Sequence, residues 1–239
     1  ESLKDTYERV LKYFKEEIEK KFTGWGDVDL TKTGKIEAEK AGNLIKNKNI
    51  KIDFYYSSLQ LRANNTLKII QKILNDKKDF PRAWQLNERH YGALTGLNKI
   101  EMSHKIGEEK VFEFRRSWET KPEPLDKKSP YHPLNIQVYK NISKEIIPDT
   151  ESLKDTYERV LKYFKEEIEK KLTNKNVLIS AHGNSIRALC KYLFKLNNIQ
   201  ISKLEIPTGN PLIIELDKNN KVENCEYLDK ERSKDLLVF

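Results

Sequence analysis

Several polar groups in this chain stand directly after short apolar runs, where proteins often place their chemistry. His182, Gly183 and Asn184 follow the apolar run 177–181 and lead into a helical pattern. The free backbone amides of a helix N-terminus bind anions, and a glycine there lets a phosphate group approach closely. A histidine that only caps the turn fits the same letters equally well.

Arg62 follows the apolar run 50–57 in the same way, and Glu88 stands in a loop beside Arg89 and His90. A carboxylate serves as a general acid near neutral pH only where burial or a second anion favours its protonated form. Without such surroundings Glu88 would form an ordinary surface ion pair, and Arg62 would be a solvated helix residue.

Arg115 and Arg116 form an adjacent pair, and guanidinium forks suit phosphate and carboxylate groups. The same pair also fits a solvated helix end. Each signal is weak alone, but together they indicate a basic pocket for a small molecule that carries phosphate.

Other kinds of site are excluded by their missing motifs. The chain has no GxxxxGK[ST] loop, no GxGxxG after a strand, no HExxH and no paired CxxC, and HGNS at 182–185 is not a GxSxG elbow. Cys190 and Cys225 have no metal-ligand spacing, which favours a reducing compartment. We therefore expect neither a P-loop nucleotide site nor a bound metal.

The composition favours a water-soluble protein. Of 239 residues, 34% are charged and 37% hydrophobic, and no apolar run approaches the roughly 18 residues of a membrane span. The net charge of +8 admits nucleic acid or anionic metabolites as partners, or only a lysine-rich composition. Without a localised basic run or an aromatic platform, nucleic-acid binding is disfavoured.

The elements that must position these residues follow an alternating order. Apolar runs and helical periodicity predict an α/β fold in one domain, residues 1–239, without a linker. Four prolines within 121–133 predict an extended excursion there. The expected strands are 50–57, 84–86, 177–181, 202–206 and 212–216, and the expected helices are those that begin near Arg62, 112–118, 153–168 and 186–194.

Residues 1–21 and 151–171 are identical. In the second copy the apolar residues mark one face of a helix, and Ser152 with Asp155 resembles a capping signal at its start. Solenoid repeats are adjacent and diverged, so this pair is not a solenoid. Identity without one change indicates a recent copying event, an engineered segment or a miswritten one.

Five stretches closely resemble the cofactor-dependent phosphoglycerate mutases of the histidine phosphatase superfamily. They are FTGWGDVDL (22–30), LNERHYGALTGLNK (86–99), SPYHPLNIQVYKNI (129–142), AHGNSIRAL (181–189) and EIPTGNPLIIELD (205–217). The resemblance implies an α/β fold with a mainly parallel sheet flanked by helices. It also implies a cytoplasmic enzyme of glycolysis and gluconeogenesis that interconverts 3-phosphoglycerate and 2-phosphoglycerate.

In such a mutase a phosphohistidine, primed by 2,3-bisphosphoglycerate, passes its phosphoryl group to the substrate. By resemblance, Glu88 is the general acid and base, and His182 stabilises the transferring group. The resemblance further implies no metal, no nucleic-acid or membrane partner, and a homo-oligomer, either dimer or tetramer. The residues it assigns to substrate binding are Thr23, Gly24, Arg62, Arg89, His90, Tyr91, Lys99, Arg115, Arg116, Gly183 and Asn184.

Residues 1–21 depart from this family. The family opens with a buried strand ending in Arg-His-Gly-Glu-Ser, whose histidine accepts the phosphoryl group, and that motif occurs nowhere in this chain. A pattern with a period of 3.6 residues cannot supply a buried strand. We therefore expect unpaired strand edges and no turnover. The alternatives are a related histidine phosphatase, a bisphosphoglycerate mutase, or an inactive pseudoenzyme that keeps the anion pocket.

Overall fold

The computed structural model describes residues 20–236, so nearly all of the first repeat lies outside the described part. The predicted loss of a central strand at 1–21 also lies almost entirely outside the described residues. The helices are α2 (Lys32–Asn47), α3 (Leu61–Leu74), α4 (Lys99–Ile106), α5 (Glu108–Arg116), α6 (Leu153–Tyr163), α7 (Gly183–Leu193) and α8 (Asn198–Lys203). The strands are β1 (Phe54–Ser58), β2 (Arg82–Ala83), β3 (Val177–Ser180), β4 (Leu212–Leu216) and β5 (Val222–Tyr227).

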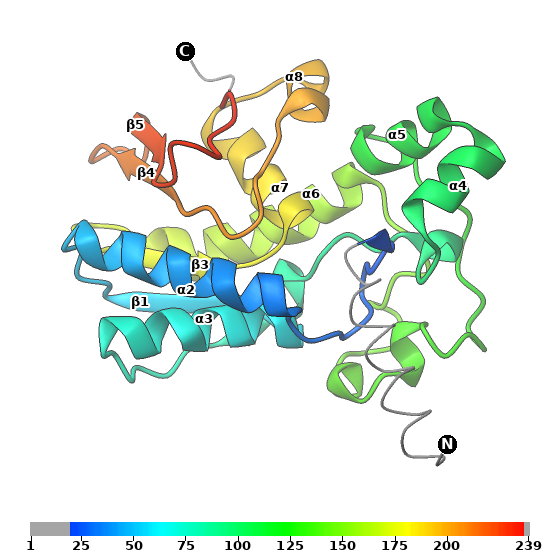
Figure 1. The fold of residues 1–239 in the computed structure, drawn as a ribbon, viewed down its shortest axis with the longest axis horizontal. Helices are drawn as coiled ribbons and strands as arrows, with labels where there is room; N and C mark the ends of the chain where they lie inside the picture. Colours follow the sequence, from blue (N-terminus) through cyan, green and yellow to red (C-terminus); the bar gives the residue numbers. More distant parts are fainter. Residues whose placement is uncertain (1–19, 237–239) are drawn as a thin grey trace.

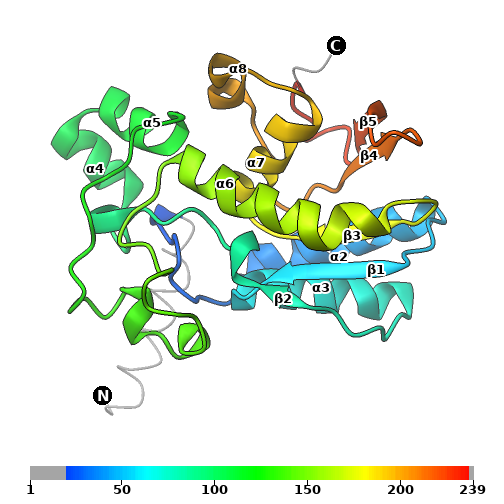
Figure 2. The same cartoon turned by 180° about the vertical axis from the view of Figure 1, so that it is seen from behind.

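A three-stranded parallel sheet in the order β2-β1-β3 forms the centre of the fold. Helices α2 and α3 cover one face of it, and α6 covers the other (Figures 1 and 2). This confirms the α/β class with a mainly parallel sheet, which needs helices on both faces to bury its strands.

Strand β1 shows how the sequence separates the two faces. Tyr55 packs with Ile52 and Leu67 on the side of α3, whereas Tyr56 packs with Phe164 and Ile168, which follow α6. Successive side chains of a strand point to opposite faces, so one strand contributes to both halves of the core.

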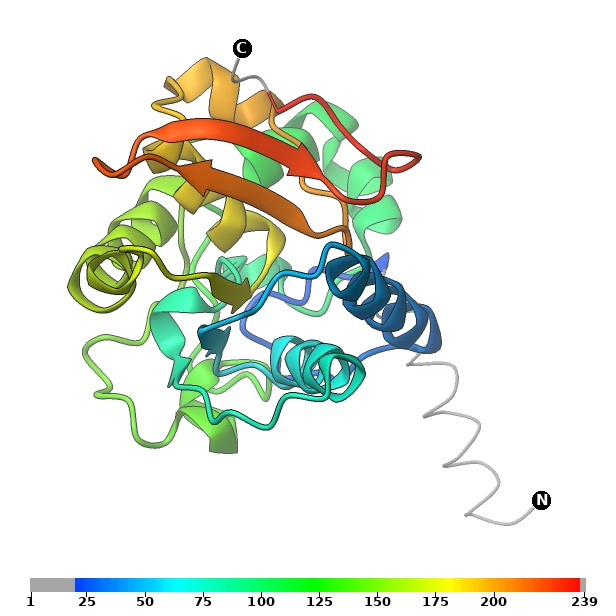
Figure 3. The same ribbon diagram turned by 90° about the vertical axis from the view of Figure 1, so that its left-hand side faces the viewer.

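Strands β4 and β5 form a separate antiparallel hairpin above the central sheet (Figure 3). Within residues 20–236, β3 pairs only with β1 and β4 pairs only with β5. Leu178 of β3 and Ile213 of β4 nevertheless pack against the same cluster of buried side chains. The two sheets therefore share a core although their facing edges are not hydrogen-bonded to each other.

The segment that runs from α4 to residue 150 lies to one side of the central sheet (Figure 1, green). Of the expected excursion at 121–133, residues 121–132 contain neither helix nor strand, whereas Pro133 begins the 3₁₀ helix Pro133–Asn135. Backbone hydrogen bonds tie this segment back to the fold, from the Ala93 amide to the Glu123 carbonyl and from the Lys154 amide to the Trp118 carbonyl.

Most of the predicted elements around the site are confirmed. Helices α3 and α7 and strands β1, β3 and β4 occur at the expected places, and 112–118 overlaps α5. The second repeat forms α6 and continues through a π-turn at Phe164–Ile168. Ser152 and Asp155 form a reciprocal capping box at its start, as expected.

Two predicted strands are wrong. Residues 84–86 form a 3₁₀ turn, closed by the Asn87 amide on the Trp84 carbonyl, and the strand is only Arg82–Ala83. Residues 202–206 are not a strand because Asn197 caps helix α8, which extends to Lys203. Strand β5 was not predicted, since its sequence VENCEY is largely polar.

Candidate active site

The carboxyl ends of β1 and β3 lie side by side, because Ser57 is paired with Ser180 in the parallel register. The residue that ends β1, Ser58, has its Oγ 2.8 Å from Nε2 of His182, and both side chains are buried. Burial lowers the pKa of His182 well below its usual range, and the positive charge of Arg62 lowers it further. The imidazole is therefore neutral near pH 7 and presents one N–H group.

Glu88 meets the N-terminus of α7. Its Oε1 accepts a hydrogen bond from the Asn184 amide at 3.2 Å and another from the Arg89 amide at 2.8 Å. The Asn184 side chain donates to the Tyr91 hydroxyl at 2.9 Å. A Cβ added at Gly183 would meet no atom within 4 Å. The space in front of this helix end is therefore open, and the helix dipole favours an anion there.

Arg62 holds the loop that precedes α2. Its Nη1 donates to the Gly26 carbonyl at 2.8 Å, and its Nη2 donates to the Gly24 carbonyl at 3.0 Å. Gly24 has φ +48°, and a Cβ there would lie 3.2 Å from the Tyr91 amide nitrogen. Burial lowers the pKa of Arg62, and the charge of Glu88 opposes that effect. Arg62 and Glu88 are thus electrostatic neighbours.

Two of the other expected binding residues, Arg115 and Arg116, end helix α5. Arg116 donates to the Leu204 carbonyl and the Glu205 carboxylate, each at 3.2 Å. Burial lowers the pKa of Arg116, and the like charge of Arg115 lowers it further. Thr23 accepts the Gly26 amide through its carbonyl at 2.7 Å, and Lys99 is the first residue of α4.

Arg89 and His90 are completely buried. Arg89 donates to the carbonyls of Glu151, Phe114 and Thr120. His90 Nδ1 accepts the Gly92 amide at 2.9 Å, and burial lowers the pKa of His90 to about 4. The Arg89 side chain therefore binds backbone carbonyls of neighbouring segments, and the His90 ring binds the backbone of its own loop.

Sequence reasoning missed two residues of this centre. Gln60 accepts the Glu88 amide at 2.8 Å through Oε1 and donates to the Gly24 carbonyl at 2.8 Å through Nε2. Arg187 donates to Asn184 Oδ1 at 2.6 Å, and burial lowers the pKa of Arg187 to about 10. The spacing of three between Asn184 and Arg187 on one helix face was a signal that could have revealed the second contact.

The complete chain has four histidines, and only one of them belongs to this centre. His104 is exposed on α4, and His132 pairs with Asp149 at 3.0 Å. His90 is buried beneath the loop. No second histidine is therefore available to face His182 across a bound group.

Two kinds of feature, a metal-binding cluster and a membrane-spanning helix, are absent from residues 20–236. No group of three or more histidine, cysteine, aspartate or glutamate side chains in that range is arranged to hold a metal ion. Within the same residues, no helix combines the length and apolarity that a membrane crossing requires.

Comparison with known proteins decides the family. The family model described as histidine phosphatase superfamily (branch 1) matches residues 14–132 and 118–225. The chain belongs to the histidine phosphatase superfamily. Solved structures agree with this fold: Bacillus stearothermophilus YhfR superposes with a TM-score of 0.63 at 19% identity, over 86% of this chain and 87% of that one. A mycobacterial glucosyl-3-phosphoglycerate phosphatase gives 0.60 at 18% identity, over 87% and 89%.

Closer relatives within the superfamily share one name. The chain is 66% identical over 223 residues to the 2,3-bisphosphoglycerate-dependent phosphoglycerate mutase of Pelagibacter ubique, covering 93% of this chain and 94% of the relative. It is 47% identical over 212 residues to the protein of the same name from Borreliella burgdorferi, covering 88% and 86%. The similarity therefore spans almost the whole length of both proteins.

Proposed function

We propose that this protein carries the substrate site of a phosphoglycerate mutase, an enzyme primed by 2,3-bisphosphoglycerate that interconverts 3-phosphoglycerate and 2-phosphoglycerate, and that the chain lacks the histidine needed for turnover. The observation that carries the proposal is the contact between the Glu88 carboxylate and the Asn184 amide at the N-terminus of α7. A carboxylate at the N-terminus of a helix, where anions bind, supports a proton-transfer role for Glu88. The names of the relatives at 66% and 47% identity support the same activity.

Each residue of the pocket has a part in this reaction. Glu88 would take the proton from the substrate hydroxyl and return it in the reverse direction. The neutral ring of His182 and the amide of Gly183 would stabilise charge on the transferring phosphoryl group. Arg62 would supply positive charge beside them. These donors and the open space at Gly183 suit a phosphate ester, and 2,3-bisphosphoglycerate, when bound, supplies the priming phosphoryl group.

The chain carries the proposed binding residues but no histidine to accept the phosphoryl group. His182 does not fit that role, since its Nε2 is engaged by Ser58 at 2.8 Å. We infer that this chain binds phosphoglycerate without forming a phosphoenzyme. The cytoplasmic location, the dimer or tetramer and the single-domain organisation stay predictions.

Calorimetric titration with 3-phosphoglycerate, together with coupled mutase and phosphate-release assays, tests the proposal. The chain should bind 3-phosphoglycerate, and His182→Asn should weaken binding by about tenfold, the worth of one charge-assisted hydrogen bond. The exposed His104→Asn is the matched control and should bind as the parent does. Binding that is unchanged in His182→Asn would contradict the assigned pocket. Phosphate release without mutase turnover would favour the phosphatase alternative.

A further inference from the structure

A buried ion pair lies beneath the loop that carries Glu88. Arg159 of α6 donates to both carboxylate oxygens of Glu151, at 2.6 Å through Nε and 2.9 Å through Nη2. Both side chains are less than a tenth exposed. Buried charges survive only where they are paired and their remaining hydrogen-bonding positions are filled. The other hydrogen bonds of these two side chains show which backbone groups the ion pair binds.

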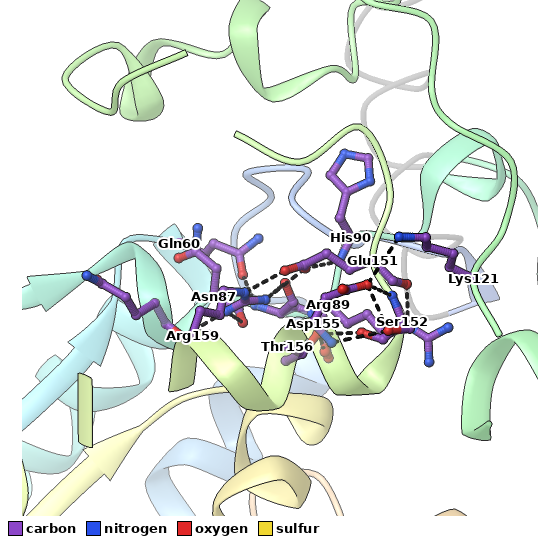
Figure 4. Close-up of polar contacts among 12 residues, drawn as sticks. Gln60, Asn87, Arg89, His90, Lys121, Glu151, Ser152, Asp155, Thr156 and Arg159 are labelled. Carbon is purple, nitrogen blue, oxygen red and sulfur yellow. Dashed lines mark hydrogen bonds and ion pairs between the residues drawn. The ribbon is translucent and has the colours of Figure 1, made fainter. Parts of the chain in front are cut away.

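Arg159 holds the carbonyl side of the loop (Figure 4). Its Nη1 donates to the carbonyls of Gln85 at 2.7 Å and Asn87 at 2.9 Å, and its Nη2 donates to the carbonyl of Glu88 at 3.0 Å. Asn87 and Glu88 lie outside helices and strands, and Gln85 belongs to the 3₁₀ turn Trp84–Leu86, whose closing hydrogen bond uses the Trp84 carbonyl instead. One guanidinium group therefore replaces regular secondary structure for three peptide groups.

Glu151 holds the far end of the same loop. Its Oε2 accepts the His90 amide at 2.7 Å, its own amide donates to the His90 carbonyl at 3.0 Å, and its carbonyl accepts Arg89 Nε at 3.0 Å. The amide of Glu88, between these anchors, is held by Gln60 from the other side. The backbone on both sides of Glu88 is thus fixed before any ligand binds.

We propose that Glu151 and Arg159 are positioning residues that aim the Glu88 carboxylate at the Asn184 amide. Neither side chain contacts that amide, so the pair acts only through the loop backbone. The inference rests on the role proposed above for Glu88. Its structural part, the placement of the carboxylate against α7, holds independently of the reaction.

The test compares three variants of the full chain. Arg159→Lys keeps the charge but cannot span the Gln85, Asn87 and Glu88 carbonyls, because an ammonium group lacks the planar fork. Glu151→Leu combined with Arg159→Met removes both buried charges together, so that neither charge is left unpaired, but it leaves the His90 amide and the carbonyls of Gln85, Asn87 and Glu88 without these partners. Arg232→Lys alters a comparable arginine, bonded to Asp229 and Glu37, and is the matched control.

Three measurements are made on each variant: thermal stability, the amide proton shift of Asn184 by NMR, and the affinity for 3-phosphoglycerate. Glu88→Gln, which keeps the side-chain shape and removes its charge, gives the direction in which the Asn184 signal moves when the carboxylate is lost. We expect Arg159→Lys to move the Asn184 signal in that direction. Its amides at 88–90 should exchange about tenfold faster than in the parent chain, while those of α2 are unchanged.

The double variant tests the positioning without leaving an unpaired buried charge. It should lower thermal stability through the backbone groups left without partners, and it should show the shifted Asn184 signal and about tenfold weaker binding of 3-phosphoglycerate, whereas Arg232→Lys should show neither the shifted signal nor the weaker binding. If Arg159→Lys does not fold, the double variant alone decides. A parent-like Asn184 signal in the double variant would overturn the inference. A parent chain that does not bind 3-phosphoglycerate would instead overturn the proposed function, while the Asn184 signal would still report the positioning.

Discussion

Protonation of His90 should make the fold sensitive to mild acid. The ring is completely buried, and Nδ1 already accepts the Gly92 amide, so a proton there would set two donors against each other. Glu151 and Asp149 favour the charged ring, but burial outweighs them and lowers the pKa from 6.5 to about 4. The protonated ring is therefore tolerated far better in the unfolded chain than in the folded one.

The size of the effect follows from these two values. Between pH 6.5 and about 4 the unfolded chain binds a proton at His90 that the folded chain does not. Stability is therefore complete above pH 6.5 and is lost as the pH falls towards 4. At 1.36 kcal/mol per unit of pKa difference, the total loss is about 3 kcal/mol, of which about 2 kcal/mol appears between pH 7 and pH 5.

Urea unfolding at pH 7 and pH 5 measures this loss. His90→Asn keeps an acceptor for the Gly92 amide but does not titrate. We expect it to lower the free energy of unfolding at pH 7, because it leaves a cavity, and to remove about 2 kcal/mol of the difference between the two pH values. The exposed His104→Asn should retain the full difference.

The buried His182 also has a lowered pKa and adds to the acid sensitivity in the same direction. The His90→Asn chain should therefore keep some dependence on pH. The reasoning is refuted if the difference in unfolding free energy between pH 7 and pH 5 is the same in His90→Asn as in the parent chain.

Three further predictions concern the pocket and the sheet. Raising the ionic strength should weaken the binding of 3-phosphoglycerate, and Arg62→Met should weaken it and flatten this salt dependence; an unchanged affinity at high salt would count against the arginine assignment. Labelled 2,3-bisphosphoglycerate should leave no acid-labile phosphate on the chain, and label recovered on His182 would contradict that role. Amides of β3 (Val177–Ser180) that point away from β1 should exchange faster in hydrogen-exchange NMR than those that pair with it, and equal protection on both sides would show that the edge is covered.

The layers of the fold could be predicted because they depend on periodicity. The apolar face of α3 recurs at helical spacing along the whole helix, so only a helix fits it. Residues 84–86 and 202–206 were misassigned because a short apolar run fits a strand, a 3₁₀ turn or the end of a helix equally well. Only tertiary contacts, such as the cap of α8 at Asn197, separate these readings.

The centre of the site was also accessible from the sequence, since the carboxyl ends of neighbouring parallel strands meet at one edge of the sheet. That rule places Arg62 beside His182, and Glu88 was recognised as a separate loop candidate. The rule for parallel strands does not say in which direction the side chain of a loop residue points. Arg89 and His90 follow Glu88 in the sequence, but the Arg89 side chain binds the Glu151 carbonyl and the His90 ring accepts the Gly92 amide.

The ion pair of Glu151 and Arg159 could not be predicted from the sequence, because the residues around it also fit a solvent-exposed helix face. Glutamate and arginine are common on exposed helices, and nothing in ESLKDTYERV says that these two are buried. Their burial depends on contacts with residues 85–90. The peptide groups there that are not paired in regular secondary structure need hydrogen-bond donors and acceptors, which water would otherwise supply. The stretch QLNERH occurs once in the chain, whereas the block containing the pair occurs twice. The proposed positioning role of Glu151 and Arg159 therefore depends on the contacts between the segment 151–171 and the loop 85–90. A second copy of the helix sequence, without a second copy of the loop sequence, cannot take the same role.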